Sequence, residues 1–389
     1  MSNISNTRKK ILILEGYCKQ CLPFIRGFRD LGCEVSVLCG SKLDCCFVSR
    51  LPHHRILGTC DVHKPEESEK YILEIIKTGK YDLVFAPFDF SARILANHKE
   101  ELSKYAVIYS NDKEVFQAAS NKSTVMKVCT ENNLPCPKTY FDIDSIETLK
   151  RMGIAFPIII KPHSSYGARG VHSFESLQEL ESYVKATNID LSDYVVQEHI
   201  PLGSQVMASI HFIDKKGNVK SGCLYKNDHL YPEDGGTSTL NSLLDRPDIE
   251  KTCEELIKKM NLKGVVGVDL MIDKRDDIGK VIEINARPPH SVTIAFIGGI
   301  NLAQQILEDA FGDEVTSMKI KKRDFALRIM QTDILWFLSS PDRFKKTPKK
   351  LGLNHVKEQM FYWDDPLPWF AFLISGIKDY RKKMHEKRQ

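Results

Sequence analysis

The stretch that decides the fold reads Gly264-Val-Val-Gly-Val-Asp-Leu-Met-Ile-Asp273, then a polar turn, then Lys280-Val-Ile-Glu-Ile-Asn-Ala-Arg287. Two apolar runs separated by a short polar segment are typical of a β-hairpin, here over residues 264–286. We expect its turn to centre near Asp276 and Asp277, with the two strands paired antiparallel. This hairpin is predicted to close the core of an α+β unit.

Three oxygen-bearing side chains share one face of this hairpin. Glu283 and Asn285 are two residues apart, so they point to the same side of their strand. Antiparallel pairing then places Asp269 opposite them, within reach across the strands. Magnesium prefers hard oxygen ligands and commonly bridges protein carboxylates to nucleotide phosphates. The pattern predicts a magnesium site, with Arg287 available to neutralise a transferring phosphate; the alternative is an edge hairpin with solvated polar residues.

The first hundred residues alternate short β-rich runs with helical patterns. Such alternation predicts a parallel sheet with helices on its faces. Ligands of these sheets lie at the carboxyl ends of the strands, which is where Glu15 and Asp89 fall. No glycine fingerprint follows the first strand, so NAD is not expected. The predicted strands are residues 11–14, 34–38 and 82–86, and the predicted helices are residues 18–31 and 66–78.

A second motif joins a buried-strand run, Pro157-Ile-Ile-Ile-Lys161-Pro162, to the small-residue loop Ser164-Ser-Tyr-Gly167-Ala-Arg-Gly170. A lysine at the end of a buried strand is unusual without an anionic partner. A loop of small residues can turn its backbone N–H groups toward phosphate oxygens. These features are consistent with a phosphate-binding loop, but taken alone they fit a flexible surface hairpin at least as well.

A third motif reads Val195-Val-Gln-Glu198-His-Ile-Pro-Leu-Gly203-Ser-Gln205. Apolar residues run into acidic and amide groups and then into a glycine turn. Such a segment can offer backbone groups to an adenine edge and a side chain to a ribose. Taken by itself, the segment is better explained as an ordinary strand end.

Composition limits the classes of protein to consider. A chain of 389 residues predicts two to four compact units, and 42% hydrophobic and 27% charged residues are a globular balance. The formal net charge of +4 is far from the basic excess of nucleic-acid-binding proteins, so we expect no nucleic-acid partner. Eleven irregularly spaced cysteines predict reduced thiols and a cytoplasmic location.

Two other local patterns are weaker. The apolar run of residues 11–14 is too short for a secretory signal, and no segment approaches the ~20 apolar residues of a membrane span. Cys18-x-x-Cys21 suggests a zinc or redox site, but no second pair at matching spacing accompanies it. We therefore expect no metal at that pair.

Order and spacing of these motifs over residues 1–310 resemble the ATP-grasp superfamily, in its branch of carbamoyl-phosphate-synthase-like and amino-acid ligases. The resemblance implies a mixed α/β and α+β fold. In it, a Rossmann-like domain precedes two subdomains that grip ATP between them. The implied division is residues 1–112 for the Rossmann-like domain, 113–200 for the small (lid) subdomain, 201–320 for the large subdomain with the metal site, and 321–389 for a helical, aromatic and basic C-terminal extension.

The resemblance also implies roles for individual residues. Lys122 matches the first nucleotide-binding lysine and Lys161 the second, while Arg287 matches a catalytic arginine just beyond the metal set of Asp269, Glu283 and Asn285. The remaining ATP contacts implied are Ser164, Ser165, Gly167 and Gly170 in the phosphate loop, Gln197, Glu198, His199 and Ile200 in the adenine hinge, and Gln205 at the ribose. Gln205 departs from the family's usual glutamate, although an amide still bonds hydroxyls. The implied substrate-side residues are Lys226, Gly235, Gly236, Thr237 and Asp89.

The function implied is ATP-dependent ligation of a carboxylate to an amine through an acyl-phosphate, with Mg²⁺, or Mn²⁺ in its place, as the cofactor. The sequence does not indicate the acid, the amine or the oligomeric state. An ATP-grasp phosphotransferase and a non-catalytic nucleotide-binding module are the alternatives. The intact set of lysines and oxygen ligands argues against the non-catalytic module.

The last 69 residues have a character of their own. They hold all three tryptophans, and their 16 lysines and arginines against 8 acidic residues give a net charge of +8. The aromatic and apolar run of residues 366–377, followed by a basic tail, suggests peripheral contact with an anionic membrane. The simpler interpretation, which we favour, is that this extension packs back on the body and covers the active-site cleft.

Overall fold

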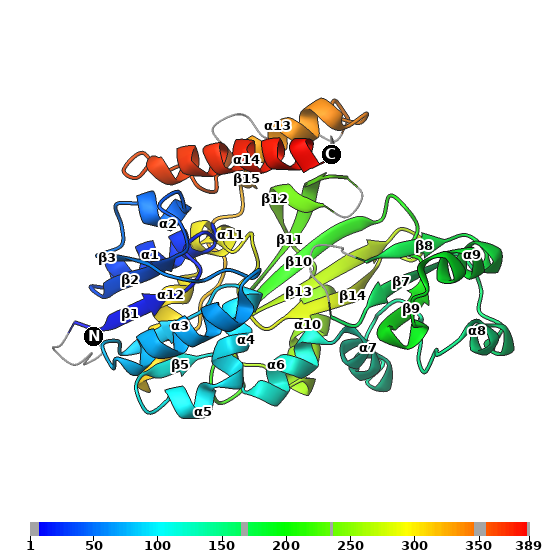
Figure 1. Ribbon diagram of the computed structural model, residues 1–389, viewed down its shortest axis with the longest axis horizontal. Helices are drawn as coiled ribbons and strands as arrows, with labels where there is room; N and C mark the ends of the chain where they lie inside the picture. Colours follow the sequence, from blue (N-terminus) through cyan, green and yellow to red (C-terminus); the bar gives the residue numbers. More distant parts are fainter. Residues whose placement is uncertain (1–7, 165–169, 234–235, 346–354, 387–389) are drawn as a thin grey trace.

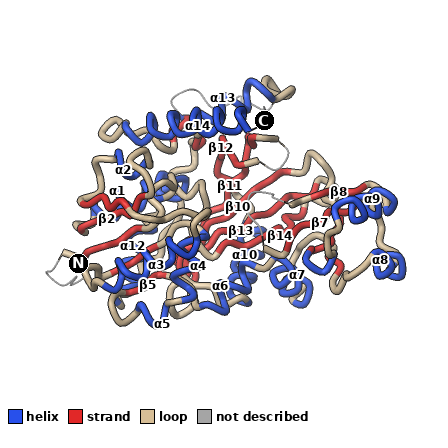
Figure 2. The backbone as a smooth tube through the Cα atoms, in the orientation of Figure 1, coloured by secondary structure: helices blue, strands red, loops and turns tan. Residues whose placement is uncertain are grey.

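The computed structural model describes residues 8–164, 170–233, 236–345 and 355–386. Its strands form three β-sheets, and the large sheet lies between the two smaller ones (Figures 1 and 2). This arrangement confirms the predicted mixed α/β and α+β fold.

The N-terminal sheet is parallel, with the strand order β3-β2-β1-β4-β5. Its central strand is fully buried because helices cover both of its faces, which is why residues 11–14 are a continuous apolar run. The order reverses between β1 and β4, where ligands of such sheets bind. The strands are β1 Lys10–Ile13, β2 Glu34–Cys39, β3 His54–Leu57, β4 Leu83–Phe85 and β5 Val107–Tyr109, and the helices are α1 Cys21–Asp30, α2 Cys45–Val48, α3 Pro65–Lys77, α4 Asp89–Asn97, α5 Lys99–Leu102 and α6 Lys113–Ser120.

No helix or strand is predicted between residues 38 and 66, but this segment contains α2 and β3. The first helix begins at Cys21 rather than Cys18, because residues 17–20 form turns. All eleven cysteines have free thiols. Burial raises the pKa of both Cys18 and Cys21.

The small sheet has the strand order β6-β9-β7-β8 and is antiparallel. Its strands are β6 Thr139–Tyr140, β7 Ile158–Pro162, β8 His172–Phe174 and β9 Tyr194–Glu198. The accompanying helices are α7 Lys122–Glu131, α8 Ile146–Met152 and α9 Leu177–Thr187, with a short 3₁₀ turn at Leu191–Asp193.

The large sheet has the order β14-β13-β10-β11-β12-β15-β16. Alternate residues of β13 enter two different cores: Val268 and Leu270 pack with α10, whereas Val265 packs with α12 and the N-terminal domain. The elements are β10 Gln205–Ile213, β11 Val219–Tyr231, β12 Thr237–Leu244, β13 Gly264–Asp273, β14 Ile278–Asn285, β15 Ala326–Arg328, β16 Val356–Glu358, α10 Pro247–Lys259, α11 Thr293–Gly298 and α12 Leu302–Phe311.

The C-terminal extension is only partly helical. Besides α13 Met330–Ser339 and α14 Leu367–Glu386, it supplies β15 and β16 to the edge of the large sheet. The two helices form a layer at one end of the molecule, and α14 also packs on α2 of the N-terminal domain (Figure 1). Arg26 binds Asp364 at 2.8 Å and Ser49 binds Asp365 at 2.5 Å. The extension therefore packs back on the body.

Candidate active site

The register of the hairpin brings the three predicted oxygen ligands together. Asp269 pairs directly with Glu283, and Gly267 pairs with Asn285. The Asn285 side-chain N–H₂ donates to Oδ2 of Asp269 at 3.0 Å. A β-bulge follows Asp269, so the turn over residues 274–277 still leaves Asp269 opposite Glu283.

This patch fits a divalent cation shared with phosphate oxygens. Burial raises the pKa of Asp269, and the negative charge of Glu283 raises it further. A cation between the two carboxylates would offset both effects. Within the described ranges, no cluster of three or more His, Cys, Asp or Glu side chains could hold a metal. The patch offers two carboxylates and an amide, a donor set that suits magnesium when a nucleotide completes the coordination.

Lys122 lies beside the patch. It is the first residue of α7, whose N-cap Asn121 accepts the Thr124 N–H at 3.1 Å. The backbone N–H of Lys122 donates to the His163 carbonyl at 2.8 Å, which ties the helix to the end of β7. Its buried ammonium binds Oε2 of Glu283 at 3.2 Å.

Lys161 reaches the same patch from the small sheet. Its buried Nζ donates to the Ile282 carbonyl at 3.3 Å, on the edge strand β14. Burial lowers the pKa of Lys161 to about 8; the charge of Glu283 opposes this shift and that of Lys122 adds to it. Two buried lysines therefore face two carboxylates where the small and large sheets meet, and polyphosphate binding would add negative charge there.

We expect nucleotide affinity to weaken as pH rises above 8. The ammonium form of Lys161 binds phosphate, and it is lost as pH rises through a pKa of about 8 in the free protein. When binding requires one protonated group, the affinity falls by up to about tenfold for each pH unit above the pKa of that group. The measurement is the dissociation constant of a non-hydrolysable ATP analogue at several pH values above 8. Lys161→Arg keeps its charge throughout and should flatten this dependence; an equally steep profile in that variant would contradict the assignment.

Arg287 is held by Asp89 rather than free. Nε and Nη2 of Arg287 donate to the two oxygens of Asp89 at 2.9 and 2.7 Å, and Nη1 donates to the Pro288 carbonyl at 3.1 Å. The guanidinium also lies 5.5 Å from the centre of the Phe88 ring. Burial lowers the pKa of Arg287, but Asp89, with smaller contributions from the charges of Asp269 and Glu283, raises it above its ordinary value. Asp89, which is predicted to lie on the substrate side, thus holds the Arg287 guanidinium in a fixed orientation.

The end of β1 adds a buried acid. Glu15 accepts the Ser91 N–H at 3.3 Å and the Tyr17 hydroxyl at 3.2 Å, and burial raises its pKa to about 7. Its backbone has φ 58°, a conformation that non-glycine residues rarely adopt.

Tyr225 is a neighbour of Asp269 that the sequence did not reveal. Tyr225 is buried, and burial together with the negative charge of Asp269 raises its pKa. On the large sheet, Ala208 of β10 pairs with Tyr225 on one side and with Asp269 on the other.

The predicted phosphate loop is described only at its two ends. The Ser164 hydroxyl donates to the carbonyl of Ser120 at 3.3 Å. Ser120 precedes Lys122 by two residues in the chain. Gly170 has φ +72°, and a Cβ there would lie 2.8 Å from Cγ of Pro162, so this position requires glycine. Ser165 and Gly167 lie outside the described residues.

The predicted adenine hinge joins the small sheet to the large one. The N–H groups of Glu198 and His199 donate to the carbonyls of Lys138 and Pro157, whereas the N–H of Ile200 has no backbone acceptor in the described part of the chain. The side chain of Gln197 is buried and donates to Thr139. Gln205 begins β10, on the far side of the turn.

Sequence patterns did not reveal that the carboxylate of Glu198 is fully engaged in the protein. It binds Arg275 at 2.9 Å and Lys280 at 3.2 Å, both on the hairpin of the large sheet. Lys280 also binds Asp273 at 2.8 Å. These ion pairs lock the hinge to the hairpin that carries the oxygen patch. Both carboxylate oxygens of Glu198 are therefore occupied by cationic side chains of the protein.

The substrate-side predictions divide. Lys226 pairs with Met207, which pairs with Leu270, so Lys226 lies on the opposite face of the large sheet from Asp269. There its ammonium binds Asp228 at 3.1 Å, and the structure does not bring it to the oxygen patch. Gly236 has no room for a Cβ, which would lie 2.1 Å from the Tyr231 carbonyl carbon, and Thr237 begins β12. Gly235 lies outside the described residues.

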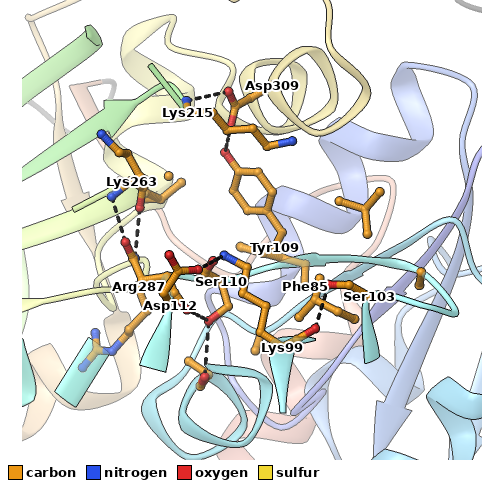
Figure 3. Close-up of a pocket in the computed structure, with 18 of the residues that line it drawn as sticks. Phe85, Lys99, Ser103, Tyr109, Ser110, Asp112, Lys215, Lys263, Arg287 and Asp309 are labelled. Atoms are coloured by element: carbon orange, nitrogen blue, oxygen red, sulfur yellow. Dashed lines mark hydrogen bonds and ion pairs between the residues drawn. The ribbon is translucent and has the colours of Figure 1, made fainter. Parts of the chain in front are cut away.

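A pocket of about 810 Å³ opens between the N-terminal sheet and the start of β13 (Figure 3). Its polar groups bind one another: Tyr109 donates to Asp309 at 3.0 Å, Lys99 binds Asp112 at 2.7 Å, and Asn111 bonds the backbone of Lys263. Arg287 belongs to its wall, whereas Lys122, Lys161 and the oxygen patch do not. The bonds of Tyr109 and Asn111 join the N-terminal domain to α12 and to the start of β13.

Comparison with known proteins matches residues 119–291 to the family model described as the ATP-grasp domain. The chain contains an ATP-grasp domain. The matched residues run from just before Lys122 to just after Arg287, and so include both lysines and the whole oxygen patch.

Three relatives show how far this likeness extends. The ATP-grasp protein is 28% identical over 303 residues to a D-aspartate ligase of Enterococcus faecium, covering 72% of this chain and 68% of that protein. It is 22% identical to a carbamoyl phosphate synthase large chain of Methanosarcina barkeri, covering 64% of this chain but only 24% of the relative. Its fold is similar to that of a biotin carboxylase from Campylobacter jejuni, with a TM-score of 0.66 and 18% identity over 80% of this chain and 72% of that one.

Proposed function

We propose that this ATP-grasp protein is an ATP- and magnesium-dependent carboxylate–amine ligase. The observation that carries the proposal is the convergence of Lys122 and Lys161 on the patch of Asp269, Glu283 and Asn285. Relatedness to a D-aspartate ligase over most of both chains supports an amino acid as one of the two substrates.

The residues divide the work of the reaction by their charge. Lys122 and Lys161 hold the phosphate chain, and Asp269, Glu283 and Asn285 would hold the cation. Magnesium, when bound, supplies positive charge to the β- and γ-phosphate oxygens. An oxygen of the substrate carboxylate attacks the γ-phosphorus, and the bond to the β-phosphate oxygen breaks to release ADP. Arg287, oriented by Asp89, offsets the charge of the transferring group.

The second half of the reaction forms the carbon–nitrogen bond. The amine attacks the carbonyl carbon of the acyl-phosphate, inorganic phosphate leaves, and the amine loses a proton. Water competes with the amine for this intermediate, so its exclusion is part of the mechanism. The partners proposed are thus a small carboxylate and a small amine, and we also propose a contact of the C-terminal extension with a membrane surface, argued below.

The test is to trap the intermediate. Incubation with Mg-ATP, a panel of amino acids and hydroxylamine should yield an acyl hydroxamate together with ADP. Without hydroxylamine, sustained ADP release should require both an acid and an amine. A phosphorylated product with no hydroxamate would show a phosphotransferase instead. The matched negative control is Glu283→Gln, which should give neither product.

A further inference from the structure

The C-terminal layer exposes more large apolar side chains than the rest of the molecule. Among the described residues, ten of the sixteen exposed large apolar or tyrosine side chains fall between residues 334 and 374. The most exposed are Trp363 at 91%, Phe344 at 76% and Leu338 at 70%. We name the set the C-terminal apolar surface; it comprises Ile334, Leu335, Phe337, Leu338, Phe344, Trp363, Leu367, Phe370, Leu373 and Ile374.

Ring contacts and helix geometry link several of these side chains. Phe344 packs edge-on against Phe337 of α13. A chain of ring contacts runs from Trp363 through Phe361 and Trp369 to Phe370. The helices are joined where the Gln331 side chain donates to the Trp369 carbonyl at 3.1 Å. The exposed residues of α14 recur at the spacing of one helix face.

The opposite side of α14 is anchored. Ala371 is buried, and Trp369 and Phe372 pack on the core shared with the N-terminal domain. The salt bridge from Arg26 to Asp364 fixes the turn that precedes the helix. The surface is therefore presented by a fixed layer, so its exposure is built into the fold. Exposed apolar patches of this kind mark interaction sites.

Charge indicates what kind of partner this surface fits. Residues 321–389 carry a net charge of +8, whereas the whole chain carries only +4, so the remaining 320 residues carry −4. The sequence that follows the apolar half of α14 contains Lys378, Arg381, Lys382 and Lys383 against Asp379 and Glu386. An apolar face beside a cationic segment complements an anionic lipid surface. Two copies of this chain meeting through the same face would bring like charges together.

We propose that the C-terminal apolar surface docks the protein on an anionic membrane, with α13 and α14 lying in the lipid interface. Within the described ranges, no helix is long and apolar enough to cross a membrane, so the contact is peripheral. Exposed Trp363 suits the boundary between headgroups and acyl chains, where tryptophan is enriched. Docking would keep the ligase close to substrates attached to, or concentrated at, that surface.

The test is co-sedimentation of the full chain with vesicles of phosphatidylcholine plus phosphatidylglycerol, and with vesicles of phosphatidylcholine alone. Wild-type protein should sediment with the anionic vesicles and be released by added salt. The variant Leu338→Glu/Phe344→Glu/Trp363→Glu should lose about tenfold or more of its partitioning. Leu57→Glu/Met152→Glu/Ile278→Glu is the matched control, because it adds the same charge at exposed apolar positions elsewhere, and it should sediment like wild type.

Three results would overturn the proposal. They are failure of the wild type to sediment with anionic vesicles, equal sedimentation with the two kinds of vesicle, and equal sedimentation of the two triple variants. A thermal unfolding measurement on each variant checks that it is folded. Analytical ultracentrifugation tests whether the surface binds a second copy of this chain instead. That assignment would follow if the wild type is a dimer that does not bind vesicles and the Leu338→Glu/Phe344→Glu/Trp363→Glu variant is a monomer.

Discussion

Replacing Glu283 with glutamine is expected to lower kcat/KM for ATP by on the order of 10²- to 10³-fold. Glutamine keeps the shape of the side chain but removes the charge that binds Lys122 at 3.2 Å and faces Asp269 across the hairpin. A cation between two carboxylates would then be held by one. The measurement is steady-state ADP release at saturating acid and amine, over a range of magnesium concentrations.

The matched control for this variant is Glu255→Gln. Glu255 lies on α10 in a surface pair with Lys251 at 3.8 Å, so its loss of charge should leave turnover unchanged. Raising the magnesium concentration should partly restore the activity of Glu283→Gln, because part of its lost activity comes from weaker binding of the metal. Activity of Glu283→Gln within a few-fold of wild type would remove the hairpin from the catalytic site.

The second large effect is expected from Arg287→Met. Turnover should fall by on the order of 10²-fold or more, because the guanidinium no longer offsets the transferring phosphate. The free energy of unfolding should also fall, by roughly 2 kcal/mol, since Asp89 loses both hydrogen bonds of a largely buried pair. The estimate is below the usual range for buried pairs because about a third of the Asp89 side chain is exposed. Chemical denaturation and single-turnover kinetics measure the two quantities separately.

Asp89→Asn separates orientation from charge compensation. The asparagine oxygen can still accept one hydrogen bond from Arg287, so we expect a smaller loss of turnover, about tenfold. If Arg287→Met is destabilised but keeps wild-type single-turnover rates in conditions where it is folded, Arg287 has a structural role only.

Local periodicity explains what the sequence could predict. Glu283 and Asn285 had to share a face because side chains alternate along a strand, and a short turn had to bring Asp269 opposite them. The β-bulge after Asp269 shifted the pairing without disturbing this outcome. The three central strands of the Rossmann-like sheet were readable because they are apolar runs, whereas its edge strands β3 and β5 were not predicted.

Contacts between segments far apart in the chain explain what the sequence could not predict. Nothing local to Asp89 indicates Arg287, 198 positions later, as its partner. Likewise, Glu198 carries no sign of Arg275 and Lys280, which bind it across the junction of the two sheets. The face of the sheet on which Lys226 lies was also not readable from the sequence, because it depends on the register of three strands. The short strands β15 and β16 are set by pairing within the large sheet rather than by their own three residues.

The most direct test of the central claim is a calorimetric titration with a non-hydrolysable ATP analogue, with magnesium and with a chelator. We expect the analogue to bind in the presence of magnesium, with an affinity that falls by about tenfold or more when the cation is removed. Glu283→Ala/Asn285→Ala should show the weaker affinity in both conditions. Equal affinity of the wild type with and without magnesium, or equal affinity of wild type and double variant in magnesium, would contradict a triphosphate held between two lysines and a cation on this hairpin.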